Sequence, residues 1–551
     1  MPIKKWPKTN KKMTKRINNI KTICILVILL LFSVFLNAQD PVKPDTVIPK
    51  KSDTTIPAKA DTLNRAKGND DKQLKLIKER KILLHSDSTE NEPKKSALVD
   101  TTVTNKYGDL LVDDTAYNKK YHFWVPAVEV LGALALTWSI DRFIINADYS
   151  HTGFSTWKYN INTGWEWDDD RFGVNFIGHP YSGTLSFNAG RSNGYNYFQS
   201  AAFAVEGSLM WEYFGENTRP SYNDLIYTTV NGAFLGEILY RLSSNVLDDR
   251  SRGANRVIRE IVAAVIDPMR GFNRLLQGKT FRITNKEVYQ KEPLNVSLYA
   301  GIRRVNDDPY GIFGKGTTSE IFNIQFDYGN PFEIRTRQPF DFFRLRVDLN
   351  YGVGRKYLDN VIGYGILSGK NMQLGKQAIL LGAFQYYDYW DNTQFELGTI
   401  GFGGGLFTKY PLSKTSFLYT SLNVAIVPFA GSSAHIDVSD TAQVRDYNYG
   451  GGLEGKFEST ANIGKYATAT MKYYFYWIRT YIGVNGNNYV QVLKPRVTFR
   501  IYKILNVGAE YSIFFNDRFM RDYPSIHTVR TEEKCFILIY LEDSQRRGQF
   551  N

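Results

Sequence analysis

The sequence predicts an α+β membrane protein: a C-terminal antiparallel outer-membrane β-barrel of roughly twelve strands, with an N-terminal apolar helical domain packed on it or in it. Three observations favour this class. The N-terminal residues are typical of an export signal, the second half of the chain alternates polar and apolar residues, and aromatic residues make up 15% of the 551 residues. Tyr and Phe suit both strands and membrane interfaces, where one end of a side chain is apolar and the other wet.

Composition and charge narrow the classes of function. The formal net charge is +13, and much of the excess lies at the extreme N-terminus. No helix or strand carries a clustered basic face with interleaved aromatics, so we expect no nucleic-acid partner. The two cysteines, Cys24 and Cys535, are too few for a disulfide framework or a cysteine metal site. We also expect no cofactor.

Residues 1–38 are typical of a secretory signal peptide. Basic residues precede an apolar core, Ile23–Leu36, and Asn37-Ala38 offers a small-residue cleavage site. A permanent anchor helix is the alternative, but the core has about 14 apolar residues where a span needs about 20. We predict cleavage and export to the outer membrane of a Gram-negative bacterium. The expected partners are outer-membrane lipid and the barrel-assembly machinery.

Residues 39–116 form a polar segment rich in Lys, Asp, Thr and Pro. Such a segment has too little apolar surface to offset the entropy lost on ordering, so we predict a disordered linker. We expect the helical domain at 117–280 and the barrel at 281–551.

The helical domain should open with an apolar helix at 121–146. Because Glu129, Asp141 and Arg142 interrupt this helix, we expect it to pack within a larger helical cluster. Short strand-like pieces follow at 157–188, around the acidic turn 168–170.

Two further helices are predicted at about 195–214 and 229–246. In the second, Gly232 and Gly236 lie on one face, where they would let another helix approach closely. Glu237 and Arg241 are four residues apart, in the favourable order for an ion pair along a helix. A third amphipathic helix should end near Asp267-Pro268, because proline cannot continue the hydrogen-bonding pattern.

From about residue 281 the hydrophobic pattern has a period of two. Arg344, Arg346 and Asp348 alternate with Leu345 and Val347, and several other segments repeat this pattern. Polar side chains on one face and apolar side chains on the other are typical of a transmembrane barrel wall. We therefore expect the arginines to face the lumen and Leu345 and Val347 to face lipid. The alternative is a secreted soluble β-domain.

The region between the linker and the barrel resembles a known family. Four motifs lie here in order: HPYSGTLSFNAGRSNG, S-x-x-W-E-Y-x-x-E, N-D-x-x-x-T and N-G-A-x-x-G-E-x-x-Y-R-L-S-S. Together they resemble the bacterial family called domain of unknown function 3943. The resemblance covers about residues 115–285. It implies an envelope protein of Gram-negative bacteria, and it implies no reaction or substrate.

The same region holds the candidate catalytic residues. They are polar groups that could supply a base or a nucleophile in a hydrolase: His179, Ser208, Glu212, Glu216, Asp224 and Glu237. We predict no metal site, because the sequence has no His-x-x-x-His or Glu-x-x-His spacing.

A structural interpretation of these charges is favoured over the catalytic one. Buried charges are seldom left unpaired, so arginines should neutralise the carboxylates and hold the helices in register. The predicted ion network comprises Arg191, Glu206, Glu212, Arg219, Glu237 and Arg241.

These observations give one leading hypothesis and two alternatives. The leading one is a non-enzymatic outer-membrane barrel whose helices plug or cap the lumen, acting in envelope architecture or in the passage of a small solute. The first alternative is a membrane-embedded hydrolase or lipid-modifying enzyme that uses polar residues of the 179–241 stretch, with a lipid as substrate. The second is a periplasmic interaction module.

Overall fold

The structure is a computed structural model of the whole chain. It describes residues 103–104, 110–111, 120–285, 287–308, 311–352, 357–392, 394–433 and 447–542. The expected signal peptide at 1–38 lies outside the described residues. So does the expected linker, apart from two short strands, β1 (Val103–Thr104) and β2 (Leu110–Leu111).

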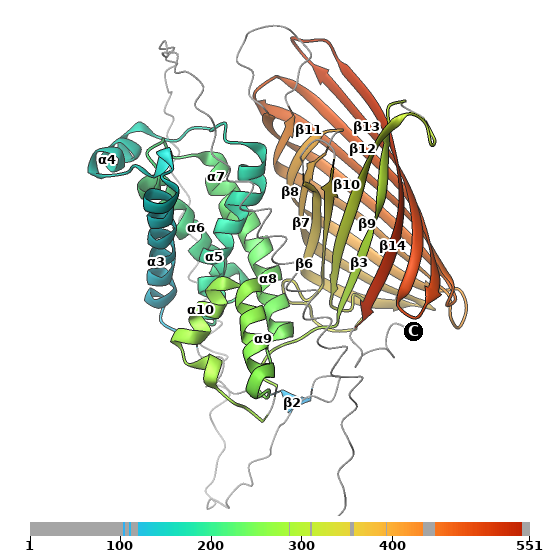
Figure 1. Cartoon of the computed structure of the whole chain (residues 1–551), viewed down its shortest axis with the longest axis horizontal. Helices are drawn as coiled ribbons and strands as arrows, with labels where there is room; N and C mark the ends of the chain where they lie inside the picture. Colours follow the sequence, from blue (N-terminus) through green and yellow to red (C-terminus); the bar gives the residue numbers. More distant parts are fainter. Residues whose placement is uncertain are drawn as a thin grey trace, which may run out of the picture. The chain divides into compact units, whose positions relative to one another are not determined.

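Twelve antiparallel strands close into a barrel (Figure 1), which confirms the predicted fold class. They are β3 (Leu294–Asn306), β4 (Gly316–Tyr328), β5 (Phe343–Tyr351), β6 (Leu358–Leu374), β7 (Gln377–Asp391), β8 (Glu396–Pro411), β9 (Phe417–Ser433), β10 (Tyr447–Ile463), β11 (Ala467–Ile482), β12 (Gly486–Tyr502), β13 (Leu505–Met520) and β14 (Ile526–Glu542). The chain order is the order around the barrel, and β14 closes it by pairing with β3, with Phe536 opposite Gly301.

Charged side chains meet across the lumen, beside a cluster of aromatic and aliphatic side chains. Arg344 on β5 bonds Glu458 on β10 over 2.7 Å, and Lys456 on β10 bonds Asp388 on β7 over 2.6 Å. These strands are not neighbours in the barrel, so both ion pairs cross its interior. The predicted lumen face of β5 is therefore correct.

Among the described residues, twelve helical segments and two single turns precede the barrel, several of them joined end to end. They are α3 (Trp124–Ile140), η1 (Asp141–Ile145), α4 (Phe154–Thr163), η3 (Val174–Gly178), α5 (His179–Ser192), α6 (Tyr197–Met210), η4 (Trp211–Gly215), α7 (Tyr222–Ile226), η5 (Tyr227–Asn231), α8 (Gly232–Val246), together with α9 (Gly253–Ile266), α10 (Pro268–Leu276) and two single turns, η2 (Asp148–Ser150) and η6 (Lys279–Phe281). We call Trp124–Phe281 the helical unit.

The strand-like pieces predicted at 157–188 are helical, so this prediction was wrong. They fall in α4, η3 and α5. Their small residues are needed for helix packing: a Cβ at Gly183 would overlap the Thr228 carbonyl oxygen, and α6 packs at Gly207 against Ser186.

The predicted stop at Pro268 is a break between two helices, because Asp267 caps α10 by accepting from the Arg270 amide over 3.0 Å.

The helical unit packs on the outer wall of the barrel and neither plugs nor caps the lumen. The helices and the barrel belong to one compact unit and share one hydrophobic core. Phe176 and Phe234 lie in this core beside Tyr387, which points away from the lumen-facing Asp388. The expectation that Leu345 and Val347 face lipid was also wrong. Both point outward, but the helices bury them.

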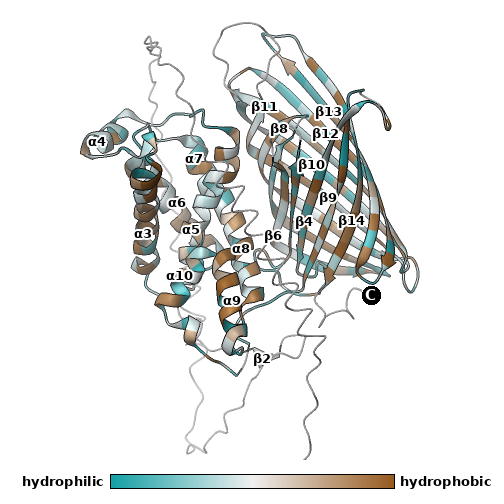
Figure 2. Ribbon diagram, in the orientation of Figure 1, coloured by the Kyte–Doolittle hydropathy of each residue, from teal (hydrophilic) through white to brown (hydrophobic). Residues whose placement is uncertain are grey.

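The first helix, α3, packs through one face only. Pro126, Ala127 and Val130 are buried, whereas Val128 and Leu136 on the other faces are exposed. The expected enclosure of this helix in a larger cluster is thus only half correct. Much of the ribbon of α3 and α9 has the colour of hydrophobic residues (Figure 2). Within the described part of the chain, no helix has both the length and the apolar character to cross a membrane.

Candidate functional site

Five carboxylates and one imidazole gather where three helical segments and a loop meet. His179 begins α5, Glu212 lies in η4, Glu216 follows it, and Asp224 lies in α7. The loop that precedes η3 adds Asp168 and Asp170. We call these six residues the acidic cluster.

Three members of the acidic cluster could hold a divalent cation. His179 Nε2 lies 3.2 Å from Asp224 Oδ1 and 3.9 Å from Asp170 Oδ2. One ligand atom from each residue lies within 4.8 Å of the others. Imidazole and carboxylate oxygens are ligands that Zn²⁺ and Mn²⁺ accept. The side chain of Asp170 is 55% exposed, so water or a substrate can reach this side of the group.

Amide and backbone donors hold the other carboxylates. The Asn223 side chain donates to Asp168 Oδ1 over 2.7 Å and to Asn175 Oδ1 over 3.0 Å. The Ser221 amide donates to Glu212 Oε2 over 2.6 Å. Asn175 in turn donates to the hydroxyls of Tyr447 and Tyr449 on β10, which ties the acidic cluster to the barrel wall. The donors named here are neutral amides, so they hold the carboxylates in place without balancing their charge.

His179, 3.2 Å from Asp224, is the cationic partner that the structure gives the buried carboxyls of the acidic cluster. Among the described residues, no lysine or arginine forms an ion pair with Glu212, Glu216 or Asp224. Burial raises the pKa of Glu212 well above its usual range, and the nearby Glu216 raises it further. Burial also raises the pKa of Asp224, and the negative charge of Asp168 raises it further. A proton or a metal ion would relieve this repulsion.

A second set of polar residues forms an ion network on α8. The Glu237 carboxylate is fully buried between Arg191, 2.6 Å away, and Arg241, 2.8 Å away. Arg241 also bonds Asp341, in the connection from β4 to β5, over 3.1 Å. The network therefore links α5, α8 and the barrel.

The sequence-predicted residues thus separate into different groups. Arg191, Glu237 and Arg241 lie in the ion network, with Asp341 as an additional member. Glu212 lies in the acidic cluster with His179, Glu216 and Asp224. The remaining three do not join either group: Glu206 is half-buried without an ion pair among the described residues, Arg219 bonds Glu166 over 3.1 Å, and Ser208 is buried with no hydrogen-bond partner for its hydroxyl.

The two packing glycines, Gly232 and Gly236, both face α5. A Cβ at Gly232 would meet the backbone of Gly183, and one at Gly236 would meet the ring of Phe187. This arrangement fits the close approach expected from their spacing.

Sequence reasoning found Asp224 but missed the other two aspartates of the acidic cluster. Asp168 and Asp170 belong to the acidic turn noted before α5, and a run of carboxylates shortly before His179 was the available signal. The expectation of no metal site rested on ligand spacing along one helix. That test cannot detect ligands that come from a loop and from two helices.

Comparison with known proteins gives a family for this region. Residues 164–269 match the family described as "Domain of unknown function (DUF3943)". The resemblance found in the sequence is therefore confirmed. The DUF3943 segment contains the whole acidic cluster, together with Arg191, Glu237 and Arg241 of the ion network.

Outer-membrane channels are among the solved structures that resemble the chain. The outer membrane channel DcaP of Acinetobacter baumannii is 8% identical, covering 45% of this chain and 96% of that one, with a TM-score of 0.20. An anion-selective porin from Comamonas acidovorans is 8% identical, covering 45% of this chain and 98% of that one, with a TM-score of 0.20. Among curated proteins, none matches the sequence.

Proposed function

We propose that the protein is a non-conducting outer-membrane barrel that holds the DUF3943 segment in the cell envelope. The observation that carries this proposal is a constriction inside the barrel, which lies apart from a larger cavity of about 710 Å³ at the strand ends beside Thr468, Thr498 and Tyr540. Ion pairs between non-neighbouring strands cross the lumen, and the cavity beside Arg344, Arg346 and Glu458 has a volume of about 10 Å³. Such a volume is about that of a single water site, whereas a porin needs a continuous water-filled path.

The outer wall supports the role of a platform. Leu345, Val347, Tyr387 and Tyr389 point away from the lumen, where a lone barrel would present them to lipid, and the helical unit covers them. Tyr197 in α6 donates to Gln385 on β7 over 2.6 Å within this interface. The barrel would therefore serve to position the helices, and passage of a small solute is not favoured.

This architecture implies a membrane environment for part of the helical unit. Helices that cover membrane-crossing strands occupy space that lipid would otherwise fill. Their remaining apolar faces would then meet acyl chains, as Val128 and Leu136 on α3 and Ile261 on α9 are all exposed. Outer-membrane lipid is thus a proposed partner, and insertion would use the barrel-assembly machinery after removal of the predicted signal peptide.

Conductance measurements test the proposal. Full-length protein in planar lipid bilayers should give no conductance steps above the empty membrane. A variant with Arg344, Arg346 and Glu458 all changed to alanine should conduct, because it removes side chains that cross the lumen. Arg521→Ala is the matched control, since Arg521 is exposed on the connection between β13 and β14. Steady single-channel steps from the wild type would refute the proposal.

The acidic cluster favours a second candidate, a metal-dependent hydrolase or lipid-modifying enzyme. Asp170, His179 and Asp224 would hold the metal, which would supply an activated water, while Glu212 or Glu216 could accept a proton. Equilibrium dialysis with Zn²⁺ and Mn²⁺ tests this candidate. It requires one bound ion per chain in the wild type and in Glu166→Gln, and loss of that ion in His179→Gln. Equal metal contents in wild type and His179→Gln would exclude it.

A further inference from the structure

A cavity in the helical unit is lined by cations. It has a volume of about 300 Å³ and lies between α5, α8, α10 and the segment that leads into β3. Six cationic side chains line it: Arg191, Arg241, Arg270, Arg274, Lys279 and Arg282. No acidic residue is among the lining residues that the structure describes. A cavity of this size is at the small end of ligand sites.

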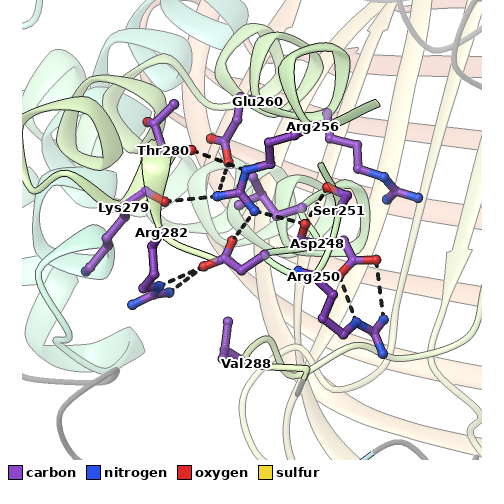
Figure 3. A network of polar contacts seen from close by, with 12 residues as sticks. Asp248, Arg250, Ser251, Arg256, Glu260, Lys279, Thr280, Arg282 and Val288 are labelled. Atoms are coloured by element: carbon purple, nitrogen blue, oxygen red, sulfur yellow. Dashed lines mark hydrogen bonds and ion pairs between the residues drawn. The ribbon is translucent and has the colours of Figure 1, made fainter. Parts of the chain in front are cut away.

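Internal carboxylates account for four of the six cations. Arg191 and Arg241 share Glu237. Arg274 and Arg282 share Asp249, which lies outside the cavity lining. Figure 3 shows Arg282 with its ion pair, and Lys279 lies beside it.

The other two cations, Arg270 and Lys279, form no ion pair with a described carboxylate. Arg270 Nη1 donates to the Tyr240 carbonyl over 2.6 Å and to Ser244 Oγ over 2.7 Å, and its guanidinium lies 4.0 Å from the centre of the Tyr240 ring. In Figure 3 the Lys279 ammonium points away from the neighbouring carboxylates. The arginine is therefore fixed in place, while the lysine has its ammonium available.

The electrostatics of Lys279 are consistent with an excess of positive charge. Burial, together with the positive charges of Arg282, Arg274 and Arg270, lowers its pKa to about 8, and the charge of Asp249 acts against this shift. Cations left without counter-charges in a partly buried site are costly. A bound anion would remove that cost.

The position of the cavity suggests where the anion comes from. Tyr289 and Gln290 line the cavity, and β3 begins at Leu294, only a few residues further along the chain. The cavity therefore lies near the end of a barrel strand, and strand ends in such barrels lie close to the lipid headgroups.

We propose that this cavity binds a phosphate-bearing anion, either a phospholipid headgroup or free phosphate. Arg270 and Lys279 would donate charge-assisted hydrogen bonds to the phosphate oxygens, with Arg274 and Arg282 beside them. Guanidinium and ammonium groups together suit this chemistry, since arginine gives directional donors and lysine a mobile point charge. The acidic cluster is a separate site, and the proposal does not depend on it.

Thermal unfolding of the full chain in neutral detergent tests this proposal. The titrants are inorganic phosphate, dihexanoyl phosphatidylglycerol below its micelle concentration, and sodium chloride at matched ionic strength. We expect a saturable rise in Tm with one or both phosphate compounds and none with chloride. Lys279→Gln should raise the half-saturation concentration by about tenfold or more, because one charge-assisted hydrogen bond is lost. Lys279→Arg should keep the affinity, and Lys376→Gln, on an exposed turn, should match the wild type.

The two sources give different results. Saturation by both compounds, with phosphate displacing the lipid, would show that the phosphate group suffices. Saturation by phosphatidylglycerol alone would assign the site to a lipid headgroup. Absence of saturation by either compound would overturn the proposal. So would equal affinities of wild type and Lys279→Gln, with folding of the variant checked by its heat-modified migration on gels.

Discussion

Gly183 on α5 and Gly232 on α8 lie back to back, so that the two helix backbones touch. A Cβ at Gly183 would overlap the Thr228 carbonyl oxygen, and one at Gly232 would meet the Gly183 backbone. Close approach of this kind is typical of helix packing in membranes, where small residues let backbones meet. It sets the position of α8, which carries Glu237 and Arg241.

We expect Gly183→Ala to destabilise the helical unit by about 1–3 kcal/mol, because the backbone of η5 must move to admit a methyl group. Gly132→Ala is the matched control. Nothing lies within 4 Å of a Cβ at that position in α3, so alanine should be neutral or slightly stabilising. Chemical unfolding in detergent micelles measures both variants. Equal stabilities would mean that the glycine contact does not hold the helices together.

Glu237→Gln should lower the free energy of unfolding by about 3–5 kcal/mol. The change leaves two buried arginines, Arg191 and Arg241, without their shared carboxylate. Glu166→Gln should cost about 0–1 kcal/mol, because Glu166 and its partner Arg219 are about one third exposed. Replacing Glu237 and Arg241 together by leucine should not restore stability, since Arg191 and Asp341 would each lose a partner. Full stability of Glu237→Gln would contradict a structural role for the ion network.

Stability should depend on pH through Asp267. Burial raises the pKa of this carboxyl to about 7, although Arg270 and Arg191 act against the shift and Glu237 adds to it. In the unfolded chain an aspartate titrates near pH 4, so between about pH 4 and pH 7 the folded protein binds more protons. This contribution to stability is complete below about pH 4 and is lost as the pH rises through about 7.

Asp267→Asn tests this dependence and keeps the oxygen that caps α10. The difference in unfolding free energy between wild type and variant should shift in favour of the variant as the pH is raised from 5 to 8. A difference that stays constant over this range would show that Asp267 titrates normally.

Arginine substitutions on the outer face of the barrel test whether this face meets lipid. Ile426 on β9 points outward and is 65% exposed, away from the helical unit. Arginine at this position should destabilise the barrel by about 2–4 kcal/mol if it lies near the middle of the bilayer. Tyr466→Arg, in the turn between β10 and β11, should cost about 0–1 kcal/mol, because a turn lies near the interface. Urea unfolding from lipid vesicles compares the two, and equal costs would place β9 outside the bilayer.

Local patterns in the sequence were enough to predict the barrel. Arg344, Arg346 and Asp348 alternate with Leu345 and Val347, and this period of two fixes which side chains share a face, whatever surrounds the strand. The spacing of Gly232 and Gly236 likewise identified a helix face made for close contact. The motifs after His179 identified the DUF3943 segment. By contrast, the short strand-like pieces predicted at 157–188 are helical, because a helix with small residues at its contacts can resemble a strand over a few positions.

Only the tertiary structure decided what covers each face. The sequence places Leu345 and Val347 outside the lumen, but it cannot distinguish lipid from α8 as their neighbour, since both are apolar. The acidic cluster depends on a loop and three helical segments that are separated in the chain but meet in space. The ion pair between Arg344 and Glu458 crosses the lumen and joins residues that are 114 positions apart. Contacts of this kind depend on how the barrel closes and on where the helices pack, and no local pattern of residues encodes either.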